Sequence, residues 1–218
     1  MGNVDENKIN KLCNKYLYKN FKNKEINIKL DHFMNTRDKI LEVTENSSFN
    51  NSCLSIVYKV KDANEFDYIY LNYVRDILTS ISLGLLSKTL REDLEIVYSV
   101  KVQPYSRYGL LEIKAFINKN NMELAKNKII EIVDSLKNPE VFKDELNNLI
   151  ERQRLDVIEK KDNKFIIFDD YISSTLNIDD TLEEYYEKYK YISCEDISNF
   201  VNRLVLDTIY FLKEKDHE

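Results

Sequence analysis

The spacing of apolar residues changes its period along the chain, and these changes mark the expected elements. Apolar residues recur at i, i+3, i+4 and i+7 after Asp5, which predicts a helix that Asp5 caps and that ends near Phe21. Residues 39–45 and 53–61 instead alternate between apolar and polar side chains. This alternation predicts two half-buried strands.

The central part of the chain returns to helical spacing and then alternates again. From Phe66 the pattern is apolar on most sides, which predicts a helix buried on more than one face. Residues 85–93 form a second helical stretch. Residues 96–103 and 108–118 read as the strands of a β-hairpin, which Pro104 and the residues after it interrupt.

Helical patterns dominate the second half. Asn121 is expected to cap one helix, and Asn138-Pro139 to start another that reaches about Lys161, because proline at the first helical position gives up no needed N–H group. Ser193 is expected to cap a later helix through a capping box with Asp196. The remaining elements are expected as helices at residues 165–176, 181–189 and 195–204 and as a closing strand at residues 206–213.

The order of these elements predicts the fold class. Strand, helix, hairpin, helices and strand favour an α+β architecture of two layers, in which helices cover one face of a mostly antiparallel sheet. No linker rich in Gly, Pro or Ser interrupts the chain, so residues 1–218 are expected to form a single domain.

Composition excludes several classes of function. With three glycines the chain has no GxGxxG or GxxxxGK[ST] phosphate loop, and with two histidines it has neither the HExxH nor the HxxEH zinc motif. Its net charge is −6, and its 32 basic residues are interleaved with 38 acidic ones, so it lacks the basic stripe that nucleic-acid binding needs. We therefore expect no motif-based metal site and no nucleic-acid partner.

The cysteine pattern and the absence of long apolar runs bear on location. Cys13, Cys53 and Cys194 are widely spaced within apolar patterns, which favours buried, reduced thiols. No apolar run approaches the roughly 18 residues of a membrane span, and no signal-peptide pattern begins the chain. These features predict a cytoplasmic protein with no membrane contact.

One segment resembles a known family. Residues 90–100 read Leu-Arg-Glu-Asp-Leu-Glu-Ile-Val-Tyr-Ser-Val. This stretch is similar to the Leu-Arg-Glu-x-x-x-x-x-Tyr-x-Val segment that marks the non-metal, C-terminal lobe of the pitrilysin/insulinase family of metallopeptidases. Its surroundings follow the family order, with an apolar helix and a turn at 82–87 before it and the hairpin after it. The turn is poorer in glycine than is usual in the family.

The resemblance extends over nearly the whole chain. Its start, Gly2-Asn3-Val4-Asp5, looks like the turn that ends a strand in the family's preceding lobe. Its last strand, residues 206–212, resembles that of bacterial homologues that lack the zinc motif and pair with a zinc-bearing paralogue. The implied fold is the lobe fold of pitrilysin and the mitochondrial processing peptidase.

The resemblance also implies a division of labour at the active site. The family's zinc lobe carries HxxEH, whereas the opposite lobe contributes an Arg and a Tyr, seven residues apart, that hold the substrate backbone and polarise the scissile carbonyl. Arg91 and Tyr98 have this spacing. The implied partners are a zinc-bearing lobe or paralogous subunit and a peptide substrate. No cofactor is expected in this chain, since zinc belongs to the partner lobe, and the chain is not expected to be active alone.

Alternatives remain open at this stage. Tyr98 shares strand parity with Val100 and Val102, which is equally typical of a core tyrosine, and Arg91 is placed to pair with Glu92 or Glu95. The whole chain also fits a non-catalytic binding or assembly module, that is, a pseudoenzyme subunit.

A more distant alternative is an unrelated enzyme with a nucleophilic cysteine. Cys194 would then need His32 or His217 as its base, because the chain has no other histidine.

Overall fold

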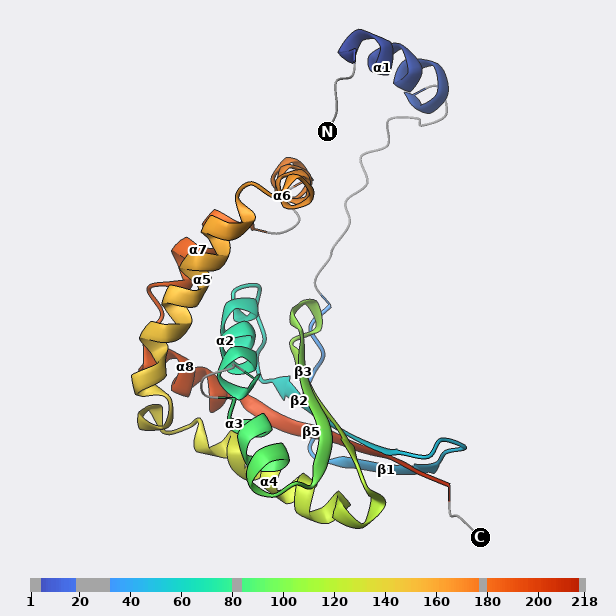
Figure 1. The fold of residues 1–218 in the computed structure, drawn as a ribbon, viewed down its shortest axis with the longest axis vertical. Coiled ribbons are helices and arrows are strands. Elements are labelled where there is room, and N and C mark those ends of the chain that lie inside the picture. The colour runs from blue at the N-terminus through green and yellow to red at the C-terminus, as the bar shows by residue number, and fades with distance from the viewer. Residues whose placement is uncertain (1–4, 19–31, 80–83, 177–179, 216–218) are drawn as a thin grey trace.

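The computed structural model describes residues 5–18, 32–79, 84–176 and 180–215 (Figure 1). A five-stranded sheet has the strand order β1-β5-β2-β4-β3. The strands are β1 (Leu41–Asn46), β2 (Ser52–Val60), β3 (Val97–Tyr105), β4 (Leu110–Ile117) and β5 (Leu204–Lys213). Only the β1–β5 pair is parallel, and the three other pairs are antiparallel, which confirms the predicted mostly antiparallel sheet and the β3–β4 hairpin.

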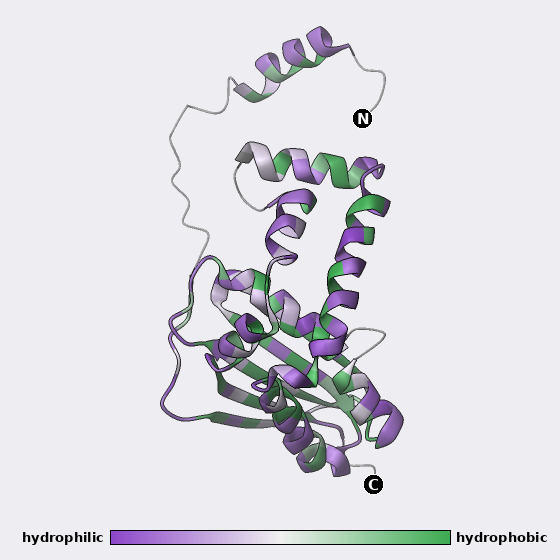
Figure 2. Ribbon diagram, turned by 90° about the vertical axis from the view of Figure 1, so that its left-hand side faces the viewer, coloured by the Kyte–Doolittle hydropathy of each residue, from purple (hydrophilic) through white to green (hydrophobic). Residues whose placement is uncertain are grey.

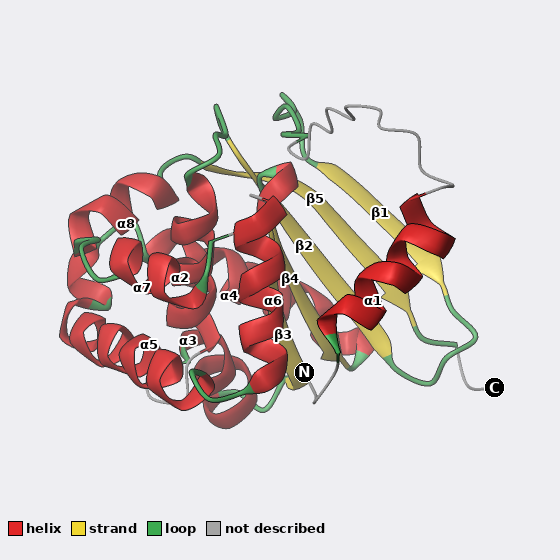
Figure 3. Ribbon diagram, turned by 90° about the horizontal axis from the view of Figure 1, so that it is seen from above, coloured by secondary structure: helices red, strands yellow, loops and turns green. Residues whose placement is uncertain are grey.

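Helices form the second layer, on one side of the sheet (Figure 3). The helices of this layer and of the arm beside it are α2 (Asp67–Thr79), α3 (Leu85–Ser87), α4 (Met122–Ser135), α5 (Leu146–Lys160), α6 (Lys164–Leu176), α7 (Leu182–Tyr189) and α8 (Cys194–Val201). Helix α1 (Glu6–Cys13) has no buried residue and stands apart from the sheet (Figure 1). The α+β class with two layers is therefore confirmed. The predicted caps are confirmed at Asp5 and, as a capping box, at Ser193 and Asp196. The predicted helix end near Phe21 lies outside the described residues.

One predicted helix cap and the length of one predicted helix are wrong. The Asn121 side chain caps no N–H group of α4, whereas Asn118 caps the 3-10 turn before it by accepting a hydrogen bond from the Asn120 N–H. The start at Asn138-Pro139 is confirmed, since the Asn138 side chain accepts a hydrogen bond from the Glu140 N–H, but the helix is only a 3-10 turn that ends before the fully buried Phe142, whose φ of −131° is not helical. Regular helix resumes only with α5.

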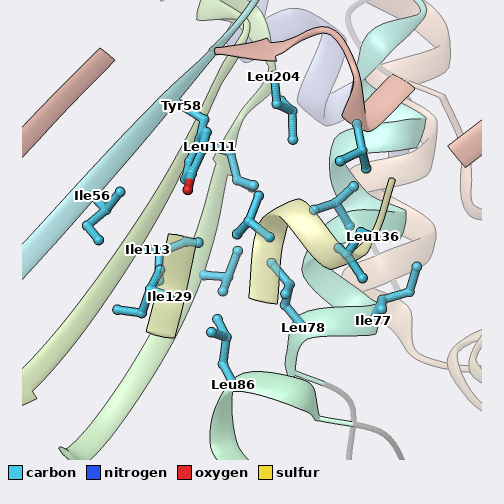
Figure 4. Packing of buried hydrophobic residues seen from close by; sticks show 14 of the residues in the cluster. Ile56, Tyr58, Ile77, Leu78, Leu86, Leu111, Ile113, Ile129, Leu136 and Leu204 are labelled. Carbon is cyan, nitrogen blue, oxygen red and sulfur yellow. The ribbon is translucent and has the colours of Figure 1, made fainter. Parts of the chain in front are cut away.

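Helix α2 is the centre of the core. Its residues Leu71, Tyr73 and Val74 have no exposed surface, and the helix contacts β3, α3, α7 and α8. Figure 4 shows side chains of β2, β4, α2 and α4 gathered into one cluster. The predicted burial on more than one face is confirmed. Phe66 is an exception, 62% exposed, because it lies in the turn before α2 and its direction is not set by the helical period.

An ion pair supports the sheet on the face opposite the helices. In the β2–β5 ladder Val57 pairs with Thr208 and Tyr58 with Leu206, which leaves Asp207 as an extra residue in a bulge. The buried Asp207 carboxylate lies 2.9 Å from the Lys59 ammonium, which also donates to the Asn35 carbonyl. Burial alone would raise the pKa of Asp207, but the Thr208 hydroxyl and Lys59 outweigh it and hold that pKa below its ordinary value.

Breaking this pair from one side is expected to destabilise the fold strongly. Lys59→Met leaves the buried carboxylate with only the half-exposed Arg37 guanidinium, 3.7 Å away, and the loss of one partner of a buried pair typically costs about 3–5 kcal/mol. The double variant Lys59→Met/Asp207→Leu removes both charges and should recover most of that loss. Urea unfolding at neutral pH measures both, and equal losses in the single and double variants would contradict the account.

The same pair gives a direction for the pH dependence. Because the folded pKa of Asp207 is lowered, its stabilising contribution is complete above the ordinary value of 3.8 and is lost as the pH falls through the folded value. Asp207→Asn should therefore flatten the loss of stability below that pH.

Candidate functional site

Arg91 and Tyr98 flank a tight turn between a helix and an edge strand. Helix α3 continues into a π-helical turn at Lys88–Asp93, and β3 begins at Val97. The Leu94 N–H donates to the Thr89 carbonyl at 3.1 Å, and the Ile96 N–H donates to the Leu90 carbonyl at 2.9 Å. These bonds close the turn over very few residues, and so the backbone positions of both candidate residues are fixed relative to each other.

Buried apolar side chains anchor the turn on both sides. Leu90 has no exposed surface, and Ile96 and Val97 are buried as well. Their neighbours Arg91 and Tyr98 are exposed. Buried residues thus stand at both ends of an exposed stretch, residues 91–95, and Tyr98 directly follows the buried pair after it.

Glu95 adopts a left-handed conformation within this turn. Its φ is +53°, which is costly for a residue with a side chain, and among the described non-glycine residues only Asp62 shares a positive φ. The left-handed residue lets the chain reverse from the helical turn into β3 without further residues. Sequence reasoning did not find this feature, because neither glycine nor asparagine marks it.

A β-bulge turns Tyr98 outward. Val97 pairs with Ile117 of β4 and Ser99 with Phe116, so Tyr98 is the extra residue in the ladder. In such a bulge the alternation of side chains shifts by one position. Tyr98 is consequently 61% exposed, whereas Val102 points into the core. The interpretation of Tyr98 as a core tyrosine from its strand parity is therefore wrong.

Arg91 makes no local ion pair. Among the described residues its guanidinium has no hydrogen-bond or salt-bridge partner, so the expected pairing with Glu92 or Glu95 is not found. The Tyr98 hydroxyl likewise has no partner within the described part of the chain. The structure thus presents two strong donors to solvent at one junction, with no hydrogen bond between them.

The outward face of the adjoining strands carries a polar cluster. Glu112 of β4 accepts hydrogen bonds from the Ser55 hydroxyl at 2.6 Å and the Tyr105 hydroxyl at 3.2 Å, and it lies 3.2 Å from the Lys114 ammonium. Burial alone would raise the pKa of Glu112, but Ser55 and Lys114 hold it below its ordinary value. Sequence analysis did not single out this cluster, although Glu112 and Lys114 stand at alternate positions between apolar residues of 108–118.

Cysteine and metal chemistry find no support in the described residues. Burial, reinforced by the Glu195 charge, raises the pKa of the Cys194 thiol, which is the opposite of what activates a nucleophile. Cys13 and Cys53 are partly exposed, so only Cys194 confirms the expected burial. His217 lies outside the described residues. Within the described ranges no three His, Cys, Asp or Glu side chains cluster so as to hold a metal ion.

An apolar surface extends from the helical arm that α5, α6 and α7 form. On α6 Phe165 is 72% and Tyr171 69% exposed, and Phe168 is exposed beside them. Leu155 and Ile158 of α5 are exposed too. Figure 2 shows hydrophobic (green) stretches along the helices of the arm, away from the sheet. We call these five residues the arm patch. Exposed large apolar side chains gathered on two neighbouring helices are typical of an interaction site. In the described ranges no helix is long and apolar enough to cross a membrane.

Comparisons with known proteins agree on one family. The family described as "Peptidase M16 inactive domain" matches residues 1–153. "Probable inactive metalloprotease YmfF" from Bacillus subtilis is 24% identical over 217 residues, which are 98% of this chain and 50% of that protein. This chain spans about half the length of that relative.

Solved structures show the same fold. A conserved protein from Enterococcus faecalis matches with a TM-score of 0.82 at 18% identity, over 100% of this chain and 51% of that one. A protease from Helicobacter pylori matches with a TM-score of 0.73 at 19% identity, over 96% of this chain and 53% of that one. Each of these similarities covers one half of a protein about twice as long.

The left-handed turn at Glu95 leads to a stability prediction. Glu95→Gly should cost nothing or stabilise the fold by up to about 1 kcal/mol, because glycine adopts a positive φ without strain. Glu131→Gly, in the exposed middle of α4, should instead cost about 1 kcal/mol. Urea unfolding of both variants measures the contrast, and equal losses would contradict the strained turn.

Proposed function

The chain belongs to the family of peptidase M16 inactive domains, related to pitrilysin and insulinase, and we propose that residues 1–218 form the non-metal lobe of such a peptidase. In this proposal the lobe works with a zinc-bearing lobe or subunit to hydrolyse peptides. The observation that carries it is the pair of exposed donors without partners, Arg91 and Tyr98, on a turn anchored by buried residues.

The chemistry of these two residues suits peptide hydrolysis. Zinc in the partner lobe would supply the attacking water. The Tyr98 hydroxyl donates a hydrogen bond to the oxygen of the scissile carbonyl as negative charge develops on it. Arg91 holds a neighbouring peptide carbonyl with its fixed fork of N–H groups.

The arm patch supports a partner lobe. Phe165, Phe168 and Tyr171 expose aromatic surface that water does not favour, and relatives of this chain are about twice its length. We propose that the zinc-bearing lobe covers this patch.

We also propose that the two lobes meet in the cytoplasm. The three cysteines of the chain are free, and free cysteines are typical of a reducing compartment.

A second candidate is a non-catalytic assembly module. It is favoured by the name of the relative from Bacillus subtilis, which is described as an inactive metalloprotease. Such a module would use the arm patch for association and leave Arg91 and Tyr98 without a role in hydrolysis.

Substitutions at the two donors separate these candidates. In the complex with the zinc-bearing lobe, Tyr98→Phe should lower kcat for peptide cleavage by about a hundredfold to a thousandfold, as the loss of one oxyanion donor does. Arg91→Ala should lower kcat/KM mainly by raising KM, because Arg91 holds the substrate backbone. Arg152→Ala on α5 and Tyr105→Phe on β3 are matched controls and should leave kcat within a factor of a few. Unchanged cleavage by both donor variants would favour the assembly module.

Substitutions on the arm patch test the partner. Phe165→Ser/Phe168→Ser should weaken association with the zinc-bearing lobe by about tenfold or more, since aromatic residues carry much of the energy of such interfaces. Phe49→Ser, at an exposed phenylalanine of the β1–β2 loop, is the control and should leave the Kd unchanged. Calorimetric titration measures both, and equal affinities would remove the arm patch from the interface.

A further inference from the structure

Two lysines face each other on the open side of the sheet. In the β3–β4 ladder Lys101 lies directly opposite Lys114, and both side chains belong to the outward set of positions. Like charges directly opposite one another destabilise an antiparallel pair. This arrangement costs stability, and a local cost of this kind is typical of a functional site.

Only one of the two ammonium groups is neutralised. The carboxylate of Glu112 lies 3.2 Å from Lys114 and raises its pKa. The same carboxylate already accepts hydrogen bonds from Ser55 and Tyr105, so it has little capacity left for a second cation. Lys101 is exposed and has no ion-pair or hydrogen-bond partner among the described residues. An uncompensated positive charge therefore remains on β3.

The position of this charge relative to Tyr98 sets what it can bind. Lys101 follows Tyr98 by three residues on the same strand, which is about 10 Å at the rise of a β-strand. An extended peptide has the same rise per residue, so a side chain three residues from the bond at Tyr98 would reach Lys101.

We propose that Lys101 is a specificity-determining residue that binds a carboxylate of the peptide substrate, an Asp or Glu side chain about three residues from the peptide bond next to Tyr98. This inference rests on the proposed function, because it takes Tyr98 as the point at which the scissile bond lies. Lys101 selects the substrate and takes no part in the hydrolysis itself.

A lysine on an edge strand has a competing role. β3 is an edge of the sheet, and lysine there prevents pairing with the edge of another molecule. That role requires only a charge of either sign and no ligand. Reversing the charge at this position therefore separates the two explanations.

The experiment measures the affinity of the 218-residue chain for three fluorescent ten-residue peptides by anisotropy. The peptides differ at one central position, which is Glu, Gln or Lys. The unaltered chain should bind the Glu peptide about three- to fivefold more tightly than the Gln peptide at low salt, and this preference should vanish at about 0.5 M salt. Lys101→Gln should abolish the preference, and Lys101→Glu should reverse it in favour of the Lys peptide.

Lys39→Glu is the matched control, because Lys39 is an exposed lysine without a partner in the described structure and lies just before β1, at the opposite edge of the sheet. It should leave the preference for the Glu peptide intact. Moving the Glu along the peptide should show one preferred position, and its absence would overturn the assignment.

Further outcomes separate this inference from the proposed function. Equal binding of all three peptides to the unaltered chain, with Arg91→Ala weakening every peptide, would overturn the role of Lys101 and leave the lobe assignment standing. Self-association of Lys101→Gln without any change in peptide preference would assign Lys101 to edge protection. A preference that follows Lys101, together with affinities that Arg91→Ala leaves unchanged, would keep the binding site at Lys101 and contradict the proposed role of Arg91 in holding the substrate backbone.

Discussion

The candidate site depends on the burial of three side chains around one turn. Leu90, Ile96 and Val97 lie in the core, and each is followed or preceded by a residue that faces solvent. Because the core is close-packed, these anchors fix the backbone of the turn more firmly than surface hydrogen bonds alone would. The left-handed Glu95 and the bulge at Tyr98 are local irregularities that this burial sustains. Without the anchors neither Arg91 nor Tyr98 would have a defined direction.

The open face of the sheet contains two kinds of charge. Lys59 pairs with Asp207, and Lys114 pairs with Glu112, so these groups stabilise the sheet and have little capacity for a ligand. Arg91, Tyr98 and Lys101 lie beside or on the edge strand β3 and have no partner in the described structure. We propose that these three residues bind the substrate. The two kinds differ in whether a carboxylate neutralises the charge. An exposed and unpaired cation contributes little to folding.

Sequence pattern predicted the elements better than it predicted the site. The periods of 2 and 3.6 residues predict the sheet and the buried α2, because side-chain burial follows those periods directly, and the spacing of Ser193 and Asp196 predicts their capping box. Strand parity alone would bury Tyr98, which is wrong because a bulge adds one residue and inverts the parity of everything before it. The helical pattern from Pro139 to about Lys161 does not reveal the break at Phe142. There the burial of one side chain in the core decides the backbone conformation, and a residue-by-residue pattern does not show which side chain the core takes up. Whether Arg91 forms an ion pair with Glu92 or Glu95 depends on where the side chains point, and residue spacing does not predict that.

The central claim is that Tyr98 stabilises the transition state of peptide hydrolysis in a partner lobe's active site. The most direct test compares two ligands of the complex with the zinc-bearing lobe, a phosphinic peptide that mimics the tetrahedral transition state and the substrate peptide of the same sequence. A donor that acts only on the developing oxyanion contributes to binding of the first and hardly to binding of the second. The account predicts that Tyr98→Phe weakens binding of the phosphinic peptide by about as much as it lowers kcat/KM, while the Kd of the substrate peptide changes little. Equal weakening of both ligands, or of neither, would contradict it.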